Sequence, residues 1–168
     1  MTVEAVFVNA GNHFLAEHQA ILQKRMQMDL NRKLKLLETS LERAAGRLGD
    51  ITIPVMERYY AEHPGAKKSF QDHGLGNRFK LEAEMVESTV YCLMTWLERP
   101  EEIRIMFGST VPHHEETLKV ESHWFNGLVD AAIYVILATI PEDKPAERAL
   151  WQEIQQELNT LIADARLH

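Results

Sequence analysis

The sequence of 168 residues contains one cysteine, Cys92, together with only 8 glycines and 6 prolines. A single cysteine excludes an internal disulfide and a zinc site built from several thiolates. No apolar run reaches the roughly 20 residues of a membrane-spanning helix, and the N-terminus lacks the basic-then-apolar order of a signal peptide. We therefore expect a cytoplasmic chain in a reducing environment, with no membrane partner.

An excess of basic residues is also missing. The formal net charge is −7, whereas nucleic acids and acidic membranes attract proteins through a basic face. We therefore expect no nucleic-acid partner. With 45% hydrophobic and 26% charged residues, the composition is that of an ordinary globular chain, and the length suffices for one well-buried core.

Apolar residues recur with a helical period along most of the chain. Steps of three and four residues connect Leu30, Leu34, Leu37, Leu41, Ala44 and Leu48, and the last segment, over 150–162, repeats this spacing. Such spacing places the apolar side chains on one face of a helix. Nothing resembles a strand, since glycine and proline separate the helical segments and no hairpin dipeptide stands between alternating runs. The pattern predicts an all-α fold of about seven or eight helices.

Residues 1–28 precede this pattern. They begin with an apolar patch, which consists of Val3, Ala5, Val6, Phe7 and Val8, and they continue as a helical segment. We predict a helical N-terminal extension over 1–28 and one domain over 29–168. The extension packs on that domain or pairs with another subunit, and the sequence leaves both arrangements open.

The most apolar helix is predicted after Val120. From Trp124 onward the residues are apolar over most of a helical surface, only Asp130 is charged, and Pro141 ends the run. A helix that is apolar almost all round belongs in the interior of a protein. We therefore expect this helix to be central to the core.

A histidine pair, His113 and His114, stands shortly before that helix. Pro112 suits the first turn of a short helix, because its missing N–H costs nothing there, and the segment 101–110 before it is less regular. The histidines would then lie on a short, well-defined turn. Two further irregular segments are expected upstream, namely a short turn over 66–70 and a polar loop over 71–77.

Several kinds of catalytic and metal site are disfavoured by their missing motifs. No His-x-x-x-His, His-Glu-x-x-His or Cys-x-x-Cys spacing occurs, which disfavours a metal held by protein side chains alone. The chain has no Gly-x-Ser-x-Gly elbow, and the glycines at 73–76 lack the lysine of a phosphate-binding loop. A single imidazole that holds the iron of a haem is one option that remains, although a histidine pair by itself indicates it only weakly.

The segment RYYAEHPGAKKSF, residues 58–70, resembles the globin signature. In globins a helix ends at His-Pro, and a short helix then leads to a phenylalanine that stacks on haem. If Phe70 is that phenylalanine, the globin spacing with a minimal loop places the proximal ligand on His114. The resemblance covers Leu30 to about Ala165 and implies a globin-like fold around haem b (iron protoporphyrin IX), with His114 as the iron ligand.

The same resemblance implies the remaining haem contacts. They are Met56, Phe70, Met85, Thr89, Leu93, His113, Leu118, Val120, Phe125 and Leu128. His113 is either an alternative ligand or a contact of a haem propionate. The position of Pro141 corresponds to the turn between the last two globin helices.

Two positions depart from the globin pattern. The distal position, usually a histidine that hydrogen-bonds bound oxygen, is Met85, and a methionine cannot donate a hydrogen bond. Bound dioxygen would lose that stabilisation unless Thr89, Tyr59 or Tyr60 reaches into the pocket. Thr110 replaces the leucine that globins usually place beneath the haem.

The resemblance implies a protein that binds or senses a diatomic gas, O2, CO or NO, rather than an enzyme, and no catalytic residue is predicted. One alternative is a haem-free globin-fold module for signalling or interaction. Another is a haem protein for electron transfer, with Met85 sulfur on iron, or for detoxifying NO or peroxide. A homodimer, formed through helical surfaces or the N-terminal extension, and a separate reductase remain open as partners.

Overall fold

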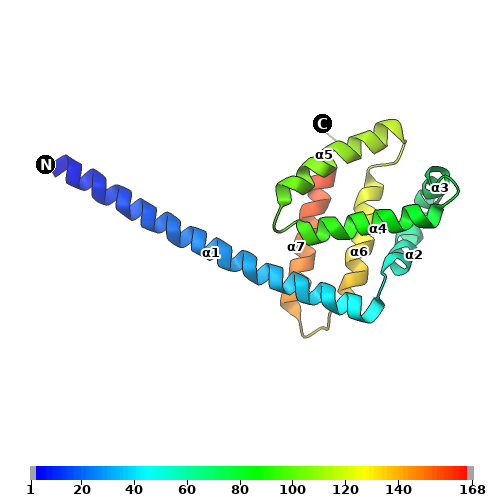
Figure 1. The fold of residues 1–168 in the computed structure, drawn as a ribbon, viewed down its shortest axis with the longest axis horizontal. Coiled ribbons are helices and arrows are strands. Elements are labelled where there is room, and N and C mark those ends of the chain that lie inside the picture. Colours follow the sequence, from blue (N-terminus) through cyan, green and yellow to red (C-terminus); the bar gives the residue numbers. More distant parts are fainter. Residues whose placement is uncertain (1–2, 166–168) are drawn as a thin grey trace. The chain divides into compact units, whose positions relative to one another are not determined.

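The computed structural model describes residues 3–165, with side chains from residue 13 onward. Seven helices follow one another in these residues: α1 (Val3–Leu48), α2 (Thr52–Glu62), α3 (Pro64–His73), α4 (Arg78–Thr95), α5 (Pro100–Thr117), α6 (His123–Leu137) and α7 (Pro145–Ala165) (Figure 1). No strand occurs between residues 3 and 165. The prediction of an all-α fold is confirmed, and seven helices are consistent with a globin-like fold.

The chain divides into two units, which are residues 1–35 and residues 36–168. Helix α1 supplies the described part of the first unit, over residues 3–35. The second unit contains the rest of α1 and helices α2 to α7. The predicted boundary lay at residues 28 and 29, before the leucine stripe, whereas Leu37 is the first fully buried side chain of that stripe. The apolar patch over residues 3–8 lies outside the described side chains.

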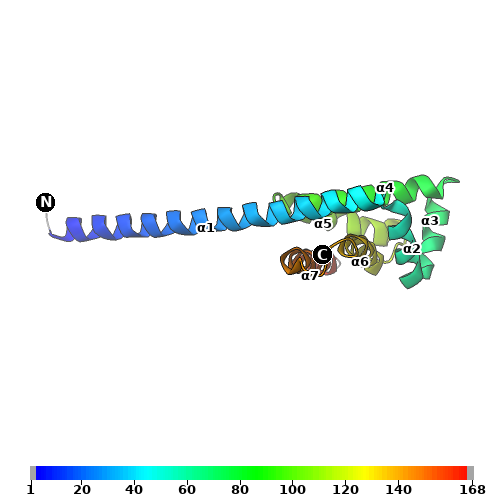
Figure 2. The same cartoon turned by 90° about the horizontal axis from the view of Figure 1, so that it is seen from below.

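Helix α6 is central to the second unit, as its sequence predicted. It packs against α2, α4 and α7, and eight of its residues are buried, namely Gly127, Leu128, Val129, Ala131, Ala132, Ile133, Val135 and Ile136. Figure 2 shows α4 and α5 on one side of this unit and α6 and α7 on the other. Helix α5 packs against α7 from the side on which α4 also lies (Figure 2).

The last turns of α1 are bound to α7 by side chains. The indole N–H of Trp151 donates to Ser40 Oγ at 2.8 Å, and both groups are fully buried. Three residues further along α1, Arg43 donates two hydrogen bonds to the carboxylate of Glu147. The C-terminal part of α1 therefore belongs to the core of the second unit.

Short connections set the directions of α2, α3 and α4. Gly49, at φ +62°, ends α1 in the left-handed conformation that glycine adopts without strain. After the break at His63, helix α3 continues through Phe70 to His73. The predicted turn over 66–70 and the first part of the predicted loop, residues 71–73, were therefore wrong, whereas residues 74–77 do connect α3 to α4, with Asn77 as the cap of α4.

Helix α5 corrects a second local prediction. It runs without a break from Pro100 to Thr117, with Pro112 in its interior, so there is no irregular segment over 101–110 and no short helix beginning at Pro112. An interior proline costs about 3 kcal/mol. Ile103, Phe107 and Val111, spaced by four, are buried on one face of α5, and this burial offsets the cost.

Candidate functional site

A cavity of about 270 Å3 opens among helices α2 to α6 of the second unit. Most of its lining is apolar. The lining residues are Tyr59, Ser69, Phe70, His73, Leu81, Met85, His114, Leu118, Val120, Trp124, Phe125 and Leu128. Five helices therefore contribute to one concave, largely apolar cavity, and small-molecule sites usually have this character.

The cavity brings together most of the residues that the globin resemblance selected. They are Phe70, Met85, His114, Leu118, Val120, Phe125 and Leu128. These residues come from α3, α4, α5, the connection after α5, and α6. The residues selected by counting along the sequence from Phe70 are up to 58 residues apart, from Phe70 to Leu128. The fold places these side chains around one cavity.

Four predicted contacts lie outside the lining. Met56 and Leu93 are buried in the hydrophobic core. The Thr89 hydroxyl donates to the carbonyl of Met85, four residues earlier, at 2.8 Å. His113 is exposed on α5, with Nδ1 3.4 Å from Thr117 Oγ1. None of these four side chains borders the cavity in this structure.

Five lining residues were not predicted as haem contacts: Tyr59, Ser69, His73, Leu81 and Trp124. Helical spacing would have found two of them, because Leu81 and Trp124 each lie four residues before a predicted contact. Tyr59 takes the place expected for Met56. These two residues are about 60° apart around α2, so a small rotation of the helix decides which one faces the cavity.

The imidazole of His114 has a defined tautomer. Its Nδ1 lies 2.8 Å from the carbonyl oxygen of Thr110, one turn earlier on α5. A carbonyl can only accept a hydrogen bond, so Nδ1 donates, and in the neutral imidazole Nε2 then keeps its lone pair. Nε2 has no hydrogen-bond partner among the described residues. The Phe125 ring stands edge-on to the imidazole, with the centroids 5.3 Å apart, and fixes its plane.

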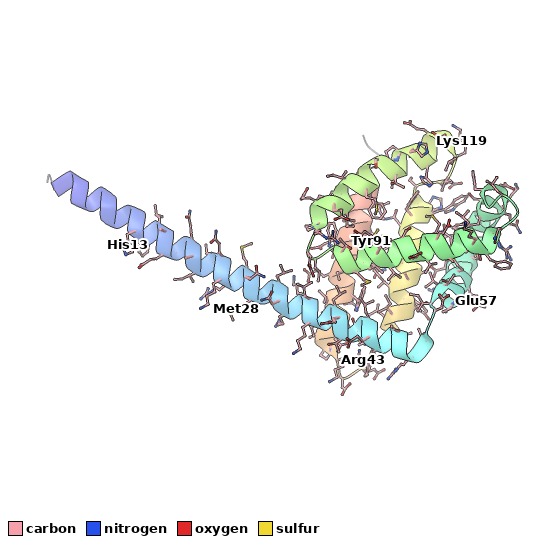
Figure 3. The ribbon with its side chains drawn as sticks, in the orientation of Figure 1. His13, Met28, Arg43, Glu57, Tyr91 and Lys119 are labelled. Carbon is pink, nitrogen blue, oxygen red and sulfur yellow. The ribbon has the colours of Figure 1, made fainter. Side chains whose placement is uncertain are left out.

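The backbone next to His114 is also fixed. Its carbonyl accepts hydrogen bonds from the N–H of Leu118 at 3.1 Å and of Val120 at 3.0 Å. Between these two, Lys119 adopts φ +56°, a left-handed conformation that costs a non-glycine residue about 1 kcal/mol. Figure 3 labels Lys119 at this end of α5. The cap holds Leu118 and Val120, two lining residues, beside the histidine.

Tyr59 supplies an uncommitted hydroxyl among the described residues that line the cavity. Its side chain is 2% exposed, and its O–H has no hydrogen-bond partner among the described residues. Burial raises the pKa of Tyr59 well above its ordinary value, so the phenol stays protonated and can donate. The two other candidate donors are already used, because Thr89 donates to the Met85 carbonyl and Tyr60 donates to Glu82 Oε1 at 2.6 Å.

Polar groups are found at one edge of the cavity, on α3. Ser69 and His73 are partly or largely exposed and line the same space as Phe70. His73 Nδ1 lies 2.8 Å from the Ser69 carbonyl oxygen, so this nitrogen donates and Nε2 is left as an acceptor, or as a second donor when the ring is protonated. The cavity therefore has an apolar interior and a polar rim.

The donor set can be tested against a haem. Among the side chains of residues 13–165, no three His, Cys, Asp or Glu residues gather as ligands for a bare metal ion. A haem iron needs only one protein ligand, inside an apolar slot. His114, with a bound Nδ1, a free Nε2 and flat apolar neighbours such as Phe70 and Phe125, fits that requirement.

Comparison with known proteins adds no relative to this description. No protein-family model matches the chain, no curated protein matches it significantly, and no solved structure is significantly similar. In addition, none of the helices within the described residues is long and apolar enough to cross a membrane.

Proposed function

We propose that the second unit binds haem b in this cavity, with His114 Nε2 as the ligand of the iron, and that the protein binds or senses a diatomic gas. The observation that carries the proposal is the hydrogen bond from His114 Nδ1 to the Thr110 carbonyl. In the neutral ring that bond leaves Nε2 available as a ligand at the wall of an apolar cavity, and it is the kind of outer contact that orients a metal-binding histidine.

The other lining residues have complementary roles in the proposal. Phe70, Phe125 and Leu128 exclude water from the macrocycle, while Ser69 and His73 provide polar partners for its carboxylates at the rim. Haem supplies an iron site at which O2, CO or NO coordinates reversibly. The chain's own residues would supply one imidazole nitrogen from His114, an apolar enclosure and a hydrogen-bond donor from Tyr59.

Tyr59 provides that donor. Dioxygen bound to ferrous iron carries partial negative charge, which a hydrogen-bond donor stabilises. Met85 cannot donate, whereas the Tyr59 hydroxyl is protonated, buried and uncommitted. The proposal therefore selects Tyr59 from the three donors, Thr89, Tyr59 and Tyr60, that the globin resemblance had left open.

The proposal is tested by removing and replacing the ligand. His114→Gly leaves space for free imidazole, so the variant should lose the wild-type Soret band after addition of hemin and regain it when imidazole is added. His113→Gly is the matched control, because the neighbouring histidine does not line the cavity, and should retain the band. Equal spectra for wild type and His114→Gly, before imidazole, would remove His114 as ligand.

A second function, electron transfer, is favoured by one observation. Met85 on α4 and His114 on α5 line the same cavity, and methionine with histidine is an axial pair of electron-transfer haem proteins. A ferrous spectrum of the six-coordinate type that becomes five-coordinate in Met85→Leu would support this function, and a separate reductase would then be needed. A five-coordinate wild type favours gas binding.

The haem-free alternative is supported by the size of the cavity. About 270 Å3 lies just below the range of roughly 300–1,000 Å3 for ordinary ligand pockets. A globin-fold signalling module that leaves the slot empty would not take up hemin. Stoichiometric binding of hemin by the wild-type chain would exclude it.

A further inference from the structure

The first unit carries an apolar repeat of seven residues on α1. Phe14, Ile21 and Met28 are 69%, 53% and 63% exposed, and Met28 is labelled in Figure 3. Leu15 and Leu22 follow the first two directly and are also exposed, and in the sequence Phe7 and Val8 occupy the preceding positions of the same repeat. A strict seven-residue repeat matches a partner helix that winds around it with a left-handed twist.

This repeat cannot be buried within the first unit, because α1 is the only helix that the unit contains among its described residues. A helix with an apolar stripe needs a second surface to cover it. We propose that the partner is a second copy of this chain, whose first unit pairs with the same unit in an antiparallel coiled coil centred between residues 19 and 20.

The charges along the stripe decide the direction of the pair. His18, Arg25 and Arg32 alternate with the exposed apolar residues Phe14, Ile21 and Met28, at steps of three and four. In a parallel pair each of these basic side chains would face its own copy inside the seam, which is repulsive. An antiparallel pair instead places each of them beside an apolar residue of the other copy, as with Arg25 beside Phe14, where the ring attracts the cation.

The flanking positions are complementary in the same arrangement. In this arrangement His18 packs in the same layer as Ile21 of the other copy. Glu17 then faces Lys24 of the other copy. Leu15 faces Leu22 of the other copy. Glu17 has only an exposed contact with His13, at 3.3 Å, and Lys24 has no partner among the described residues. The two-fold symmetry of the pair forms each of these contacts twice.

A lipid surface is the competing occupant. Residues 1–35 contain 5 Lys or Arg and 3 Asp or Glu, so the unit is basic although the whole chain is acidic. A helix that lies on an anionic membrane keeps its basic residues on the face opposite the apolar one. Arg25 and Arg32 instead lie within the apolar stripe, which favours a second copy over lipid.

Light scattering of the full chain over a range of concentrations tests the pairing. The wild type should form a dimer, and Ile21→Asp should raise the dimer dissociation constant by roughly 100-fold or more, because a charge enters the apolar seam twice. Gln23→Asp is the matched control on the opposite face of α1 and should leave the constant within a factor of about three. A monomeric wild type, or equal effects of the two variants, would overturn the proposal.

The antiparallel direction is tested by exchanging charges. Glu17→Lys and Lys24→Glu should each weaken the dimer roughly tenfold, since each replaces two attractive pairs by two repulsive ones, and the combined variant should restore it. A combination that fails to restore the dimer would overturn the antiparallel pairing. Co-sedimentation of monomeric wild type with phosphatidylserine vesicles, but not with neutral ones, would assign the stripe to lipid instead.

Discussion

At the scale of single residues, the haem proposal gives different roles to His114 and Tyr59, which line the same cavity. The imidazole is held by the Thr110 carbonyl so that its second nitrogen is free. The phenol is buried without a hydrogen-bond partner among the described residues, at a raised pKa. In the haem proposal, the free nitrogen would hold the iron and the uncommitted donor would stabilise a partly charged gas ligand.

Tyr59→Phe should accelerate the dissociation of O2 by roughly 10- to 100-fold, which corresponds to one hydrogen bond of about 1.4–2.8 kcal/mol to a partly charged ligand. The dissociation of CO, which carries little charge, should change by less than about threefold. Stopped-flow ligand replacement measures both rates. The substitution keeps the ring that packs on His63 and Phe70.

Tyr60→Phe is the control for this prediction. Tyr60 does not line the cavity and donates to Glu82, so its loss should leave both dissociation rates nearly unchanged. If Tyr60→Phe and Tyr59→Phe altered O2 release equally, the donor role of Tyr59 would be wrong.

The residues of the site could be predicted in part. The spacing from Phe70 to His114 came from the globin resemblance, because the apolar pattern alone did not give the extents of α3 and α5. Which residue of α2 faces the cavity depends on a helix rotation of about 60°. That rotation results from packing against His63, Phe70 and α6, and no local pattern encodes it. The sequence therefore predicted Met56 as the cavity residue of α2, whereas the structure places Tyr59 there.

At the scale of helices, the contact between α1 and α7 is a polar one inside the core. Ser40→Ala should destabilise the second unit by about 1–3 kcal/mol, because the buried Trp151 N–H loses its acceptor. Urea denaturation followed by tryptophan fluorescence measures the change. Thr39→Ala, at the exposed neighbouring position, should cost less than about 0.5 kcal/mol, and a similar loss in both variants would contradict the assigned hydrogen bond.

The start of α2 gives a prediction that depends on pH. Hydrogen bonds from the side chain and the backbone of Thr52 lower the pKa of Asp50, and the backbone N–H donates at 2.8 Å. A lowered folded-state pKa contributes stability that is present above the unfolded pKa, near 4, and is lost as the pH falls through the folded value. Asp50→Ala should therefore destabilise the chain by about 0.5–1 kcal/mol at pH 7.

This deficit should shrink below about pH 4, where wild-type Asp50 becomes protonated as well. Asp50→Asn retains a side-chain acceptor without a charge, so its stability relative to Asp50→Ala should not vary with pH. Thermal unfolding between pH 3 and pH 7 follows all three proteins. A deficit of Asp50→Ala that grew on acidification would have the wrong sign.

The helices themselves could be predicted from apolar periodicity, and their ends could be predicted less well. Gly49 and Pro141 lie in connections, as the sequence indicated. Pro112 does not, because burial of Ile103, Phe107 and Val111 along one face of α5 outweighs the lost hydrogen bond. Tertiary packing of this kind is invisible to a rule that treats proline as a helix boundary.

At the scale of the whole molecule, the two units differ in where their apolar side chains lie. The described side chains of the first unit, from residue 13 onward, expose a repeating apolar stripe, while the second unit encloses a cavity. The predicted boundary between an extension and a domain, at residues 28 and 29, differs from this division by seven residues, because a stripe of leucines does not show where its burial begins.

Binding of haem should stabilise the second unit through mass action. If hemin is present at about 1,000 times its dissociation constant, the free energy of unfolding should rise by about 4 kcal/mol. Thermal unfolding with and without hemin measures the shift in Tm. His114→Ala should show a much smaller shift, whereas an equal shift would indicate non-specific hemin adsorption.

The most direct test of the haem proposal is the visible absorption of the purified chain during titration with hemin, followed by reduction and addition of CO. We predict saturation at one haem per chain, with a Soret band that moves when CO binds opposite His114. Hemin that stays free in solution, with no saturable change in its spectrum, would contradict the proposal and leave the cavity to another ligand.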